Sequence, residues 1–192
     1  MKLKLIINNL TILFFIFILT GVNLNSEDNI SIKSVSITDD RYVIDSALIL
    51  SNRNLDNLIN KIEESELEER TNITQIPKFI FKFINDITNE FTIANPNEKW
   101  QVGCVVFEEL PRRKFEYFGL GSNVALMTYK SGGIGTSTKI LIFHFENDKI
   151  IDFWCGNKLK DLKNIDEIIA HLIENKDKKW GLNTNVISLY YK

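Results

Sequence analysis

The sequence has few of the residues on which many functional sites depend. Its 192 residues include only two cysteines, two histidines and three prolines. Two cysteines cannot form a structural zinc site, and two histidines on separate segments show no metal-ligand spacing. The formal net charge of -2 gives no electrostatic field that would attract nucleic acid. We therefore expect no metal, no cofactor and no nucleic-acid partner.

Long apolar runs are also scarce, with one exception at the N-terminus. Lys2 and Lys4 precede an apolar stretch from Leu10 to Leu19, which small and polar residues follow. This order is typical of a secretory signal peptide, and the apolar stretch is short compared with the roughly 20 residues of a membrane-spanning helix. We predict a signal peptide over residues 1–25, with an uncleaved anchor over residues 5–22 as the alternative. Either form predicts an exported protein, periplasmic or extracellular, with membrane contact only through this segment.

The remaining residues, 26–192, have the composition of one globular domain, since 44% of the chain is hydrophobic. Abundant Ile, Asn and Lys suggest an AT-rich bacterial genome. Two amphipathic helices are predicted before residue 95. The first carries Leu55, Leu58, Ile59 and Ile62 at helical spacing, and the second follows Pro77 with a wide aromatic stripe from Phe79 to Phe91. A third helix is predicted after Asn164, with a stripe formed by Ile165, Ile168, Ile169, Leu172 and Ile173.

The segment from Trp100 to Gly156 predicts five β-strands separated by short turns, the first of them from Trp100 to Leu110. Such short connections favour an antiparallel meander. We therefore expect an α+β fold in which a curved meander of about five strands (100–156) packs on one side against the three helices. The layout resembles that of cystatin-like, cone-shaped or nuclear-transport-factor-like domains by analogy only. Shorter strands are expected at residues 30–37 and 186–191, whereas Arg41 to Leu50 fits either a helix or a strand.

The hairpin around residues 144–152 decides which side chains share a face. An odd number of loop residues would place Phe143 and Phe153 on an apolar face, and His144, Asp152 and Trp154 on the other. Because register follows burial, we expect this arrangement. A carboxylate beside an imidazole can support general-base chemistry, so His144 and Asp152 are the candidate catalytic residues. The alternative is a polar pair with a purely structural role.

Further candidates come from glycine, tryptophan and cysteine. Gly132 and Gly133 invite comparison with a phosphate loop, but the segment leads into a strand instead of a helix, so turn geometry explains them better. With Trp154 they remain candidate ligand-binding residues. Export would place Cys104 and Cys155 in an oxidising compartment, where they would either form a disulfide or remain as two buried thiols.

No motif identifies a function. One acidic cluster and one basic cluster are the remaining sequence features that could mark a binding surface. The acidic cluster consists of Glu63, Glu64, Glu66, Glu68 and Glu69, and the basic cluster of Arg112, Arg113 and Lys114. The leading hypothesis is a non-enzymatic domain that binds a ligand or protein partner between sheet and helices. A small hydrolase or isomerase using His144 and Asp152 is the alternative. A second alternative is an immunity-like or inhibitor protein that uses the acidic cluster.

Overall fold

A computed structural model describes residues 32–182, except residues 40, 89, 104–106, 108, 134, 159–161 and 163. All described residues belong to one compact unit that begins at Ile32. The predicted signal peptide and the predicted strand at residues 186–191 lie outside the described residues, so both remain predictions. No helix within the described ranges has the length and apolar character needed to cross a membrane.

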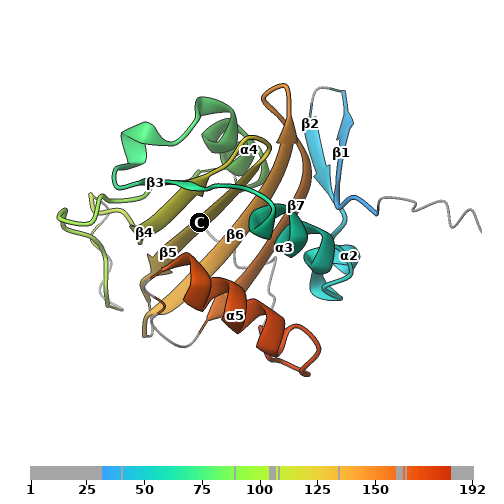
Figure 1. Ribbon diagram of the computed structural model, residues 1–192. Helices are drawn as coiled ribbons and strands as arrows, with labels where there is room; N and C mark the ends of the chain where they lie inside the picture. Colours follow the sequence, from blue (N-terminus) through green and yellow to red (C-terminus); the bar gives the residue numbers. More distant parts are fainter. Residues whose placement is uncertain are drawn as a thin grey trace, which may run out of the picture. The chain divides into compact units, whose positions relative to one another are not determined.

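The predicted α+β fold with a five-stranded antiparallel meander is confirmed (Figure 1). Each strand pairs with the next one along the chain, in the order β3-β4-β5-β6-β7. The strands are β3 (Glu68–Arg70), β4 (Arg113–Leu120), β5 (Val124–Ser131), β6 (Ser137–Glu146) and β7 (Lys149–Lys158).

The first strand of this meander comes from a different part of the chain than predicted. The described residues between Trp100 and Leu110 form no strand, and β3 occupies the edge beside β4 instead. The side chain of Gln101 organises this segment as a loop, because its amide donates to the Gly103 carbonyl and accepts from the Phe107 N–H. Val102 and Phe107 are exposed, so the apolar alternation there serves no sheet face.

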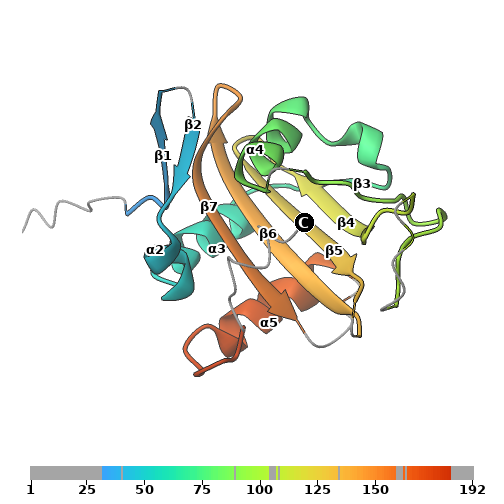
Figure 2. The same cartoon turned by 180° about the vertical axis from the view of Figure 1, so that it is seen from behind.

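Helices cover both faces of the sheet, whereas the sequence predicted only one covered side. The helix α3 (Leu55–Glu63) and the helix α5 (Ile165–Asn175) lie in front of the sheet in Figure 1 and behind it in Figure 2. The helix α4 (Lys78–Thr88) packs on the opposite face, where Phe83 contacts Phe143 and Phe153 edge-on. Two covered faces explain why β5 and β6 are buried at nearly every position.

The three predicted helices form where the apolar periodicity placed them. Leu55, Leu58, Ile59 and Ile62 are the buried residues of α3. Asn164 caps α5 as predicted, with its side-chain oxygen accepting from the Glu167 N–H. The ambiguous segment from Arg41 to Leu50 is both strand and helix: β2 (Arg41–Ile44) pairs with β1 (Val35–Thr38), and α2 (Ser46–Leu50) follows.

Candidate functional site

His144 and Asp152 are direct cross-strand partners on β6 and β7, and Trp154 pairs with Ile142 on the same face. This face is the one that α3 covers. His144 and Asp152 are both buried, at 7% and 2% exposure. The structure thus brings together the three residues that the sequence placed on one face. Gly132 and Gly133 lie elsewhere. His144 pairs with Val124 at the start of β5, whereas the two glycines follow the end of that strand.

One oxygen of the Asp152 carboxylate accepts several structural hydrogen bonds. Its Oδ1 atom accepts from the Ser34 N–H at 2.9 Å, the Ser34 hydroxyl at 2.8 Å and the Asn54 side-chain amide at 2.8 Å. Asn54 is the residue that precedes α3, and Ser34 precedes β1. Asp152 therefore joins the start of β1 and the start of α3 to β7. These contacts suit a structural carboxylate more than one that orients an imidazole.

The His144 imidazole makes no hydrogen bond with another residue of the described ranges. Burial is the main cause that lowers the pKa of its imidazole below 6.5, and the positive charge of Lys61 on α3 adds to this. Glu146 and Asp152 act in the opposite direction with smaller effects. The side chain is thus held neutral at neutral pH. Trp154 is also used structurally, since its indole N–H donates to the Asn52 side-chain oxygen at 3.0 Å.

Gly132 and Gly133 serve the turn after β5. The Gly132 N–H donates to the Arg112 carbonyl and the Gly133 N–H to the Val102 carbonyl. A Cβ atom at Gly132 would lie 1.8 Å from the Gln101 carbonyl oxygen, so only glycine permits this close approach. Gly133 also adopts a φ of 149°. The turn leads into β6 and not into a helix, as the sequence indicated.

The tentative disulfide between Cys104 and Cys155 is not formed, since Cys155 is a free, buried thiol. Cys155 lies opposite Leu141 on β7, at the edge of the sheet farthest from β3 and β4. The segment before Cys104 lies at the β4–β5 side of the sheet, because the Gln101 N–H donates to the Pro111 carbonyl and the Val102 carbonyl accepts from the Gly133 N–H. Cys104 itself lies outside the described residues. No group of three His, Cys, Asp or Glu side chains suited to a metal ion occurs within the described part of the chain.

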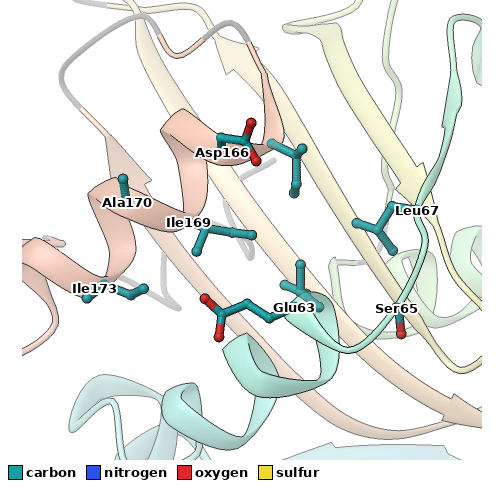
Figure 3. Close-up of a pocket in the computed structure, with 9 residues that line it drawn as sticks. Glu63, Ser65, Leu67, Asp166, Ile169, Ala170 and Ile173 are labelled. Carbon is teal, nitrogen blue, oxygen red and sulfur yellow. The ribbon is translucent and has the colours of Figure 1, made fainter.

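An open groove of about 500 Å³ lies between α3 and α5, and sequence reasoning did not identify it (Figure 3). Ile165, Ile169 and Ile173 form one apolar wall at successive turns of α5. Ile62 and Leu67, at the end of α3 and just beyond it, form the other. Figure 3 shows Ile169 pointing from α5 toward the Leu67 side of the groove. The sequence grouped five apolar residues of α5 into one stripe, but only Ile168 and Leu172 of that stripe are buried.

Carboxylates flank this groove. Glu63 and Asp166 are the charged residues among its lining, and no lysine or arginine lines it within the described ranges. Tyr117 lies on the same sheet face. Burial raises the pKa of its hydroxyl, and the negative charges of Glu69 and Asp166 raise it further. The groove therefore combines an apolar floor with a negative potential along its edges.

Two other hollows lie elsewhere on the described surface. One of about 520 Å³ is lined by residues at the start of α4 and the β6–β7 turn, including Phe79, Phe145 and Asp148. The other, of about 620 Å³, lies beside β2 and is lined mainly by polar groups such as Arg41, Lys82 and Asp86. Neither has a row of uncovered apolar side chains from one helix, and none of the three hollows is lined by His144.

Comparisons with known proteins give no relative. No family model, no curated protein and no solved structure matches this chain. The site must therefore be interpreted from its own chemistry.

Proposed function

We propose that this protein is a non-enzymatic binding domain and that the groove between α3 and α5 receives a partner segment. The single observation that supports this is the apolar row Ile165, Ile169 and Ile173, which faces Ile62 and Leu67 across the groove. Ile173 is 46% exposed. Helices that already pack on a sheet rarely keep a second apolar row unless another surface covers it.

The chemistry of the groove favours an amphipathic helix with basic residues along its edges. Apolar side chains spaced by three and four residues would lie between the two helices, as in other helix-in-groove complexes. Lysine or arginine at the edges of that helix would then face Glu63 and Asp166. The surrounding acidic residues Glu64 and Glu66 are exposed and extend the negative surface. Of the acidic cluster in the sequence, Glu63 lines the groove, and Glu64 and Glu66 follow it in the chain.

The test uses two synthetic amphipathic helices of about 14 residues, one built from leucine and lysine and the other from leucine and glutamate. Fluorescence anisotropy with labelled peptides gives the two affinities for the full chain. The leucine–lysine peptide should bind and the leucine–glutamate peptide should not. Ile169→Asp should weaken binding about tenfold or more, because it places a charge in the apolar contact. The double variant Glu63→Lys/Asp166→Lys should weaken it through charge reversal.

Two control variants keep the test specific. Ile37→Asp changes an isoleucine on β1 that is 48% exposed, and Glu146→Lys reverses an exposed charge on the β6–β7 hairpin. Both should bind the leucine–lysine peptide as the unmodified chain does. If the groove variants also bind it unchanged, the groove is not the binding surface and the proposal is wrong.

A further inference from the structure

A polar region lies on the face of the sheet opposite the groove between α3 and α5, beyond the area that α4 covers. The side chains at the apolar end of this face include Phe143 and Phe153, which contact α4. Toward the other end of the strands the same face becomes polar. The register places Tyr129 opposite Lys139, and Ser131 lies between Arg113 and Ser137 as the partner of both.

Two cations lie in this region and both are largely buried. Lys139 is 8% exposed and Arg113 is 9% exposed. Arg113 has a partner, since its guanidinium lies 4.6 Å from the centre of the Phe91 ring, and its positive charge also acts on the Tyr129 hydroxyl. The Lys139 ammonium has no hydrogen bond or ion pair with any residue of the described ranges. Its Nζ atom is not among the fully buried polar atoms that lack a partner, so an anion from solvent can reach it.

The groups that act on the Lys139 ammonium are a cation and a thiol. The charged or titratable neighbours that act on its ammonium are Arg113 and the Cys155 thiol, and no carboxylate is among them. Burial is the main cause that lowers the pKa of Lys139, and the nearby Arg113 lowers it further. Ser131 and Ser137 add hydroxyl groups to the same face, and both are only half-buried. Within the described part of the chain, the region therefore holds two cations and no carboxylate that acts on Lys139.

We infer that Lys139 and Arg113, with the hydroxyl groups of Tyr129, Ser131 and Ser137, form a binding site for an oxyanion, either a carboxylate or a phosphate group. The anion would supply the missing counter-charge to Lys139 and accept hydrogen bonds from the guanidinium and hydroxyl donors. The turn at Gly132 and Gly133 would border this site, because it directly follows Ser131. This inference is independent of the groove between α3 and α5, which lies on the other face of the sheet.

Binding is tested on the full chain with inorganic phosphate and with acetate, each replacing sodium chloride at constant ionic strength. Amide chemical shifts in ¹H–¹⁵N NMR spectra give the affinity and the location. At least one of the two anions should shift the amides of Ser131, Gly132 and Ser137 in a saturable way. The stronger of the two responses identifies the oxyanion as phosphate or carboxylate. Shifts that do not saturate, or that occur away from these residues, would overturn the inference.

The variant Lys139→Gln should weaken the anion affinity by about tenfold or more, because it removes one of the two charges. Lys149→Gln is the matched control, since Lys149 is an exposed lysine on the neighbouring strand. It should keep the affinity of the unmodified chain. If Lys139→Gln binds the anion equally well, the inference is wrong. Should that variant not fold, Ser137→Ala provides the second test, and its affinity should fall while Thr136→Ala, at an exposed position, leaves it unchanged.

Discussion

Asp152 lies directly opposite His144, although the hairpin that joins their strands has an even loop. Glu146 pairs with Lys149 around the two-residue turn Asn147–Asp148, and both turn residues have positive φ angles of 49° and 59°. The pairing then shifts by one residue, because Phe145 pairs with Ile150 whereas His144 pairs with Asp152. Ile151 is thus the extra residue of a β-bulge. The predicted faces of Phe143 and Phe153, and of His144, Asp152 and Trp154, are correct, but a bulge produces them instead of an odd loop, and it pairs Ile150 with Phe145.

This bulge predicts the effect of shortening β7. Deleting one of the adjacent isoleucines 150 and 151 would leave His144 opposite Asp152 in a regular ladder, so all later residues would keep their faces. We expect the protein to fold and the free energy of unfolding to fall by about 1 kcal/mol, which corresponds to the loss of one half-buried isoleucine. Denaturant unfolding followed by circular dichroism measures this value.

Deleting Ile142 from β6 provides the control. It removes the same residue type from a position without a bulge, so every residue on one side of the deletion would change faces against two neighbouring strands. That variant should not fold. If both deletions are equally harmful, Ile151 is not a simple bulge residue.

The hydrogen bonds of Asp152 predict that this residue stabilises the domain. Asp152→Asn should lower the free energy of unfolding by about 1.5–3 kcal/mol, because it replaces the charged carboxylate that accepts hydrogen bonds from Ser34 and Asn54 with a neutral amide. Urea denaturation measures the change. Asp148→Asn makes the same substitution at the exposed turn of the hairpin, where asparagine is equally suited to the positive φ, and should be neutral. Equal losses in the two variants would show that the Asp152 contacts contribute little.

The elements that the sequence predicted well are those in which a local pattern coincides with a tertiary need. The apolar spacing of α3 and the cap at Asn164 of α5 act within a few residues, so they could be recognised without the rest of the chain. The strand β3 could not be recognised, because Glu68, Glu69 and Arg70 show no apolar alternation. It forms a strand because β4 offers unpaired backbone groups at its edge.

The candidate site was harder to predict for a related reason. Five apolar residues of α5 fit one stripe, and only the position of α3 decides which of them the domain buries. Ile168 and Leu172 face the core, whereas Ile169 and Ile173 line the groove. Similarly, the sequence showed that His144 and Asp152 could share a face, but not that Ser34 and Asn54 would occupy the carboxylate. Contacts between distant segments determine both outcomes.

The lowered pKa of His144 predicts how stability depends on pH. Its imidazole is protonated less readily in the folded than in the unfolded protein, whose histidine has a pKa near 6.5. The unfolded state therefore binds more protons once the pH falls below about 6.5, and stability is lost as the pH falls toward the folded pKa. His144→Gln should lose less stability than the unmodified protein between about pH 7.5 and pH 5.

Two measurements test this prediction further. NMR titration of the His144 ring protons should give a pKa below 6.5, and Lys61→Gln should move that pKa upward because Lys61 contributes to the shift. Lys149→Gln, which removes an exposed lysine on the same hairpin, should leave it unchanged. A His144 pKa at or above 6.5 would contradict the prediction.

The environment of Cys155 predicts an unreactive thiol. Burial raises its pKa to about 12, and the positive charge of Lys139 only partly opposes this effect. Because the thiolate is the reactive form, iodoacetamide at about pH 8 should leave Cys155 unmodified in the folded protein and modify it fully in denaturant. Peptide mass spectrometry reports the labelling at this residue, and the mass of its peptide should be the same with and without reductant. Rapid labelling of the folded protein, or a reductant-dependent mass, would show that Cys155 is accessible or disulfide-bonded.

The variant Lys139→Gln should label even more slowly, since it removes the one charge that favours the Cys155 thiolate.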